Sequence, residues 1–170
     1  MRHVHLVRLD AAVEQSLAND VEYRAALIHD DWARVATVVH RVVGRILTAP
    51  PVSVDELHWG GYFAVDHETR EVVGSCAFKT APSGDGAVEI AYFTYPGFEG
   101  RGYATQMARR LVELASRSAT VRRVIAHTLP ETNASTRVLE KVGMTCVGEV
   151  MDPDDGRVWR WELPVGVHLD

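Results

Sequence analysis

The stretch of residues 89–105, EIAYFTYPGFEGRGYAT, contains the residue types best suited to chemistry in this chain. Its glycines Gly100 and Gly102 lie where a run of β-branched and aromatic residues gives way to apolar residues at helical spacing. Glycine there permits unusual backbone dihedrals and the close approach of a ligand, and a helix start presents N–H groups that lack intrahelical partners. This combination predicts an anion site suited to phosphate groups.

A second candidate is Glu89, an acidic residue in an otherwise apolar run between Val88 and Ile90. A carboxylate in such a position must be paired, exposed or functional. Removal from water makes a carboxylate a stronger base, so a role beside a reacting amine is one interpretation. A structural ion pair with an arginine is the other, and the sequence leaves both open.

Other nucleotide motifs do not fit the glycine turn. A Rossmann fingerprint needs a third glycine where Thr105 stands, and a P-loop needs Lys and Ser or Thr where Tyr103 and Ala104 stand. Both are excluded. The alternative to an anion site is a plain turn at the start of a helix, with no binding role.

The first part of the chain predicts one strand followed by helices. Residues 4–9 form the strand, and residues 11–18 and 21–28 form one broken helix or two short ones. Asp30 and Asp31 are candidate N-caps for a longer helix that ends at residues 49–51, Ala-Pro-Pro. The apolar stripe of this helix consists of Trp32, Val35, Val39, Val42, Val43 and Ile46.

The later part predicts a strand meander and two further βα units. Strands are expected at residues 62–65, 72–79, 88–95, 121–127 and 144–151, and in a last strand after the turn at 152–156. Helices are expected from residue 104 and over residues 134–142, where Gly143 ends the second one. The order indicates an α+β fold around a mixed sheet, with strands 88–95 and 121–127 parallel. Trp159, Trp161 and Leu163 share a face of the last strand, which is interpreted as core or as a homodimer surface.

Length and composition set limits on the class of protein. With 170 residues, 46% of them apolar, we expect a single domain spanning residues 1–170. A net charge of −5 without a basic stripe argues against a nucleic-acid partner. No apolar run reaches membrane-spanning length and the first residues lack a signal-peptide core, so we expect no membrane partner and a cytoplasmic location.

The potential metal ligands are scattered along the chain. Cys76 and Cys146 lie far apart in apolar runs without CxxC spacing, so we expect buried, reduced thiols. His3 and His5 share a strand face but have no third ligand nearby. We therefore expect no metal.

Two motifs together carry a resemblance to a known family. Residues 99–104, EGRGYA, match the pattern Q/R-x-x-G-x-G/A, and residues 129–144, LPETNASTRVLEKVGM, match N-x-x-S-x-x-V-L-E-K-x-G-F. The chain thus resembles the GNAT acyl-CoA N-acyltransferases, and among them the RimJ/RimL-like N-terminal acetyltransferases of ribosomal proteins. Two positions depart from the pattern: Glu99 replaces Gln or Arg and is assigned no phosphate contact, and Asn133 precedes Ser135 by two positions instead of three.

The resemblance implies acetyl-CoA as cosubstrate and a role for each matching residue. Main-chain groups of Phe93 and Thr94 would face the pantetheine and the thioester, Asn133 would reach the pantetheine arm, and Ser135 would lie near the sulfur. Glu89 would serve the acceptor amine. The pyrophosphate would be held by main-chain N–H groups of Gly100, Arg101, Gly102, Tyr103, Ala104 and Thr105.

Some of these roles have structural alternatives. Thr132 or Asn133 would cap the helix that begins at Ala134, and Ser is common in a first helical turn. Many relatives have a tyrosine four residues before the glycine that follows this helix, as the acid for the leaving thiolate. This chain has Leu139 there, so a tyrosine acid from that position is excluded.

The resemblance and the residues together predict the transfer of an acetyl group from acetyl-CoA to a primary amine. The amine would be a protein N-terminus or a small molecule, and it would attack directly in a ternary complex, since no Ser-His-Asp or Cys-His arrangement suggests a nucleophile. Two alternatives stay open. One is a non-catalytic acyl-CoA sensor or interaction module of the same fold, and the other is a structural protein without a coenzyme A site.

Overall fold

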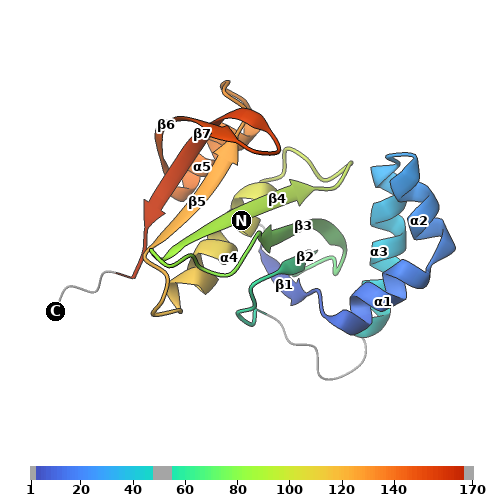
Figure 1. Cartoon of the computed structure of the whole chain (residues 1–170). Coiled ribbons are helices and arrows are strands. Elements are labelled where there is room, and N and C mark those ends of the chain that lie inside the picture. The colour runs from blue at the N-terminus through green and yellow to red at the C-terminus, as the bar shows by residue number, and fades with distance from the viewer. Residues whose placement is uncertain (1–2, 48–54, 167–170) are drawn as a thin grey trace.

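A mixed sheet forms the centre of the molecule. The computed structural model describes residues 3–47 and 55–166, without the side chains of residues 45–47. Within these residues the strands form a seven-stranded sheet in the order β1-β2-β3-β4-β5-β7-β6 (Figure 1). They are β1 (Val4–Arg8), β2 (Gly61–Asp66), β3 (Val72–Phe78), β4 (Ala87–Thr94), β5 (Arg123–Thr128), β6 (Thr145–Asp152) and β7 (Gly156–Pro164). The pair β4 and β5 is parallel and its neighbours are antiparallel, which confirms the predicted α+β fold and the predicted parallel pair.

The helices begin within one residue of the positions that the sequence predicts. They are α1 (Ala11–Asn19), α2 (Val21–Ile28), α3 (Trp32–Leu47), α4 (Tyr103–Ser116) and α5 (Ala134–Val142). The first two are separate short helices, and the Asp31 carboxylate caps the third by accepting the N–H of Arg34 at 3.1 Å. The prolines expected to end α3 lie outside the described residues.

Helices pack against both faces of the sheet. Leu6, Tyr62 and Ala64 point into a core shared with α4 and α5. Their neighbours Val7 and Phe63 point the opposite way, into a second core shared with α1, α2 and α3, because successive strand residues alternate between faces. Figure 1 shows α1–α3 grouped at one side of the molecule and β5–β7 at the other.

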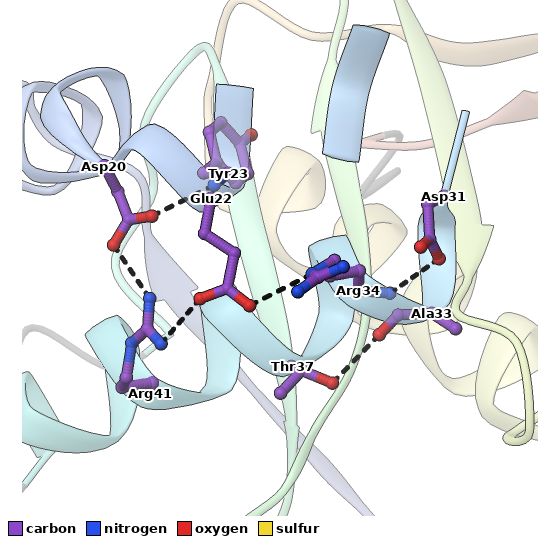
Figure 2. A network of polar contacts seen from close by, with 8 residues as sticks. All are labelled: Asp20, Glu22, Tyr23, Asp31, Ala33, Arg34, Thr37 and Arg41. Atoms are coloured by element: carbon purple, nitrogen blue, oxygen red, sulfur yellow. Dashed lines mark hydrogen bonds and ion pairs between the residues drawn. The ribbon is translucent and has the colours of Figure 1, made fainter. Parts of the chain in front are cut away.

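A network of charged residues ties α2 to α3 (Figure 2). Asp20 caps α2 by accepting the N–H of Tyr23 and also receives a bond of 2.9 Å from Arg41. Glu22 accepts from Arg41 at 2.9 Å and from Arg34 at 3.0 Å. The Tyr23 N–H and Arg41 together lower the pKa of Asp20. One end of α2 is therefore anchored on α3 by several polar bonds.

The expected burial of Cys146 and of Trp32 is wrong. The structure also bears on whether the face of the last strand that carries Trp161 belongs to the core or to a homodimer surface. Cys146 lies exposed on β6, an edge strand of the sheet, whereas Cys76 is buried as expected. Trp32, which the sequence predicts to belong to the apolar stripe of α3, is 39% exposed. Trp161 is buried in the core, which supports the core interpretation of its stripe. Within the described ranges, no helix is long and apolar enough to cross a membrane.

Candidate functional site

The parallel pairing of β4 and β5 stops partway along both strands. Its last pair joins Glu89 to Ile125. Beyond it, β4 stays bonded to β3 as far as Thr94, and β5 stays bonded to β7 as far as Thr128. The strands therefore separate toward their carboxyl ends, where ligands of such sheets bind. The facing backbone edges keep N–H and C=O groups that a ligand can satisfy.

A cavity of about 640 Å³ lies at this opening. Residues 89–93 of β4, residues 126–128 of β5 and Leu129, which follows β5, form its sides. Lys79, which follows β3, and Asp155, in the turn between β6 and β7, bring charge to its wall. The Asp155 N–H donates to Asp152 within that turn, as expected of a turn residue.

Glu89 is the acidic centre of this first cavity, with its side chain 18% exposed. Its Oε1 atom lies 2.6 Å from Nζ of Lys79 and 3.0 Å from Nδ1 of His127. The hydrogen bond to Glu89 raises the pKa of Lys79. Glu89 is thus paired as well as placed at a cavity, and its partners are Lys79 and His127, whereas the ion-pair interpretation of the sequence named an arginine. Among the described residues, Nε2 of His127 is buried and has no hydrogen-bond partner.

An aromatic pair stands beside the same cavity. Phe93 lines it and is 42% exposed. Its ring centroid lies 5.1 Å from that of Trp32, the first residue of α3. This contact explains why Trp32 leaves the helix core, and it brings α3 to the wall of the site.

A second cavity of about 590 Å³ lies between the glycine turn and α5. Gly100 and Gly102 adopt φ values of 72° and 86°, the left-handed region that favours glycine. Gly102 is the N-cap of α4 and makes no side-chain cap bond. Ala104 and Thr105, in the first turn of α4, line the cavity. A helix start of this kind attracts anions.

Two basic residues of α5, Arg137 and Lys141, also line the second cavity. They favour a polyanionic ligand. The Glu99 carboxylate accepts the N–H of Gly97 at 2.7 Å, so it turns back onto its own loop. Arg101 lies outside the lining of this cavity, with its guanidinium 5.7 Å from the ring centroid of Phe98.

The two cavities meet at Tyr92, Phe93 and Ser135, which line both of them. The Tyr92 hydroxyl lies 3.0 Å from Oγ of Ser135 and 3.4 Å from its carbonyl oxygen. Burial raises the pKa of Tyr92, against a smaller opposing effect of the Ser135 bond. Leu139, one turn further along α5, is fully buried.

Asn133 and Tyr103 have structural duties besides their expected roles. Asn133 caps α5 by accepting the N–H of Thr136 at 3.1 Å, while the Thr136 hydroxyl accepts the N–H of Asn133. Asn133 also lines the first cavity. Tyr103 is buried and its hydroxyl lies 2.6 Å from Oδ2 of Asp66, so the side chain belongs to the core.

The structure therefore gathers most of the expected residues and adds others. Glu89 and Asn133 line the first cavity, and Phe93 and Ser135 line both. The second cavity is also lined by Thr94, Gly100, Gly102, Tyr103, Ala104 and Thr105.

Sequence reasoning missed several residues of the site. For Arg137 and Lys141 a signal existed, since residues four apart share a helix face. Lys79, Tyr92 and His127 gave none, because their roles depend on contacts between distant segments. The described part of the chain contains no group of three or more His, Cys, Asp or Glu side chains suited to a metal ion.

Comparisons with known proteins agree with this geometry. A family model described as an acetyltransferase (GNAT) domain matches residues 9–145. The uncharacterised N-acetyltransferase p20 of Bacillus licheniformis is 28% identical over 85 residues, which are 50% of this chain and 48% of p20. The chain thus spans about half the length of this curated relative.

Solved structures share the fold at low sequence identity. RimL, a ribosomal L7/L12 alpha-N-protein acetyltransferase, aligns with a TM-score of 0.52 and 19% identity over 62% of this chain and 70% of its own. The aminoglycoside acetyltransferase AAC(6′)-Ib in complex with coenzyme A aligns with a TM-score of 0.52 and 20% identity over 62% of this chain and 67% of its own.

Proposed function

Because the chain belongs to the GNAT acetyltransferase family, we propose that it transfers an acetyl group from acetyl-CoA to a primary amine within a ternary complex. One observation carries the proposal: two cavities meet at Tyr92, Phe93 and Ser135, beside the point where β4 and β5 separate. A cofactor entering from one side and an amine from the other would bring their reacting atoms together there.

The second cavity suits the coenzyme. Main-chain N–H groups of residues 100–105 would hold the pyrophosphate, and Arg137 and Lys141 add positive charge. Each such amide bond is modest, and the helix dipole adds about 0.3–1 kcal/mol. The backbone of Phe93 and Thr94 would bond the pantetheine and stabilise the oxyanion. Asn133 would reach the arm from the start of α5.

The first cavity suits the acceptor. Glu89 would take a proton from the amine, directly or through water, and the neutral nitrogen would attack the thioester carbon. The C–S bond then breaks and its electron pair stays on the sulfur, near Ser135. The products are an acetamide and coenzyme A, with no covalent enzyme intermediate.

The acceptor class is a protein N-terminus or a small-molecule amine. RimL and AAC(6′)-Ib, which share the fold, are named for acceptors of these two kinds. An α-amine of pKa about 8 is neutral in about one molecule in ten at pH 7, whereas a lysine-type amine near 10.4 is neutral in about one in a few thousand. Acetylation of a lysine-type amine therefore depends far more on a base such as Glu89 than acetylation of an α-amine does.

A second candidate function is acyl-CoA binding without turnover, as a sensor or interaction module. It is favoured by Leu139. The family resemblance implies at this position a tyrosine that protonates the leaving thiolate, and a leucine cannot do so. A thiol-release assay over a panel of α-amines, polyamines and aminoglycosides separates the two. We expect release with at least one amine, together with thermal stabilisation by coenzyme A. Stabilisation without release would support the binder, and no stabilisation would overturn both.

Four further expectations stay predictions. They are a single N-acetyltransferase domain over residues 1–170, a cytoplasmic location, a homodimer as one of the oligomeric states to test, and the absence of metal, nucleic-acid and membrane partners. Size-exclusion chromatography with light scattering checks the assembly.

A further inference from the structure

We infer that Tyr92 of β4 delivers the proton that the coenzyme A sulfur needs when the thioester breaks, with Ser135 holding the Tyr92 hydroxyl. The inference rests on the proposed acetyl transfer, because it assigns a group to one step of that reaction. It makes Tyr92 a catalytic residue and Ser135 a positioning residue.

The position of the hydroxyl is the first support. Tyr92 and Phe93 are neighbours on β4 and point to opposite faces of the strand. Phe93 reaches toward α3, where it meets Trp32, and Tyr92 reaches toward α5, where it meets Ser135. Both tyrosine and serine line the cavity that suits the coenzyme and the cavity that suits the amine. The Tyr92 hydroxyl therefore lies where the two would exchange the acetyl group, on the α5 side of β4.

The chemistry of the two hydroxyls decides which of them is the donor. A phenol ionises near pH 10, whereas the aliphatic hydroxyl of serine is a far weaker acid, so Tyr92 is the better proton source. A tyrosine is already protonated at neutral pH, and burial raises the pKa of Tyr92 further, so its hydroxyl carries the proton before the thioester breaks. Leu139, at the α5 position facing the core, has no proton to give.

The proton balance of the step is as follows. The amine nitrogen bonds to the acetyl carbon and the C–S bond breaks, leaving its electron pair on the sulfur. The Tyr92 hydroxyl proton moves to that sulfur, and the Ser135 hydroxyl stabilises the phenolate by donating to it. Water returns a proton to Tyr92, while the proton lost by the amine passes through Glu89 to water.

The first test compares Tyr92→Phe with the wild-type protein. Because a thiolate leaves well without help, we expect kcat to fall by about 10²-fold, the low end for a general acid. The KM for acetyl-CoA should change less than about threefold, because the phenyl ring keeps the cavity wall. Tyr23→Phe is the matched control, since Tyr23 is a partly buried tyrosine of α2 outside both cavities, and it should leave kcat unchanged.

Ser135→Ala provides the second variant. It keeps the phenol and removes one bond to it, so kcat should fall by less than about tenfold. A loss larger than that of Tyr92→Phe would make serine the proton donor and overturn the assignment. Thermal unfolding with and without coenzyme A confirms that each variant is folded and binds the cofactor.

The decisive test changes the leaving group. The selenium analogue of acetyl-CoA releases a selenolate, which is much less basic than a thiolate and needs little protonation. We expect the loss caused by Tyr92→Phe to shrink from about 10²-fold with the thioester to less than about fivefold with the selenoester. Equal losses with both donors would mean a structural role and would overturn the inference.

These outcomes separate the inference from the function on which it rests. Wild-type turnover with equal losses overturns only the role of Tyr92. A wild-type protein that binds coenzyme A but releases no thiol with any amine overturns the acetyl transfer and the inference with it.

Discussion

The Glu89 carboxylate and the His127 imidazole meet at 3.0 Å, just beyond the last pair that joins β4 to β5. His127 lies two residues past Ile125, the backbone partner of Glu89, so the two side chains project from the same face. A polar contact thus continues the link between these strands where their backbone bonds end, and the same carboxylate faces the cavity assigned to the acceptor.

Glu89→Gln should distinguish acceptor amines by their basicity. With a lysine-type amine, we expect kcat/KM at pH 7 to fall by about 10²-fold, because a general base contributes about 10²–10⁴-fold. With an α-amine the loss should stay below about tenfold, since more of that amine is already neutral. Rates measured from pH 6 to 10 with both amines check this. Glu140→Gln, an exposed carboxylate of α5 outside both cavities, serves as the control. Unchanged pH–rate profiles for every amine would rule out Glu89 as the base.

Arg137→Ala and Lys141→Ala should weaken the binding of coenzyme A. Both side chains line the cavity beside the glycine turn but are exposed, so we expect Kd to rise about three- to tenfold for each. The dependence of Kd on salt should become shallower, because fewer charges meet the phosphates. Calorimetric titrations at two salt concentrations measure both effects. Arg24→Ala, an exposed arginine of α2, should leave them unchanged, and an unaltered Kd in both cavity variants would place the phosphates elsewhere.

Gly102→Ala should destabilise the fold. Gly102 has a φ of 86°, and a side chain in left-handed backbone costs about 1–2 kcal/mol. Gly44 offers the opposite case: it lies within α3, and a Cβ added there meets nothing within 4 Å. Gly44→Ala should raise the free energy of unfolding by about 0.5–1 kcal/mol. Urea unfolding measures both values, and equal effects of the two substitutions would contradict the assigned backbone geometry.

Alkaline pH should weaken the fold through Tyr62. Burial raises the pKa of Tyr62 to about 12, and its hydroxyl accepts the N–H of His58 at 2.7 Å. An unfolded tyrosine loses its proton near pH 10, before the folded one does, so the free energy of unfolding falls as pH rises from about 10 to about 12. The loss is about 3 kcal/mol. Urea unfolding at several pH values should show a shallower decline for Tyr62→Phe, and an identical decline would contradict this origin.

The sequence predicts the fold well because its signals are local. Two strand-like apolar runs on either side of the polar turn at residues 66–70 indicate a hairpin, and the change of spacing after Gly102 indicates a helix start. The sequence also offers Thr132 or Asn133 as the N-cap of α5, and the structure has Asn133 there. These features depend on neighbours within a few residues of the chain.

The features that the sequence does not predict depend on contacts between residues far apart in the chain. Lys79 pairs with Glu89 because β3 and β4 align in one register, and His127 joins them from a third strand. Trp32 fits the periodicity of a buried stripe but meets Phe93 at the protein surface. Cys146 belongs to an apolar run that forms an edge strand, and apolar composition does not distinguish an edge from a centre.

The short pairing between β4 and β5 has a mechanical meaning. The backbone bonds that join the β1–β4 half of the sheet to the β5–β7 half end at Glu89 and Ile125. A molecule that formed hydrogen bonds to the open edges of both β4 and β5 would link the two halves of the sheet. Part of its binding free energy would then stabilise the sheet, and hydrogen exchange in β5 would slow when the molecule is bound.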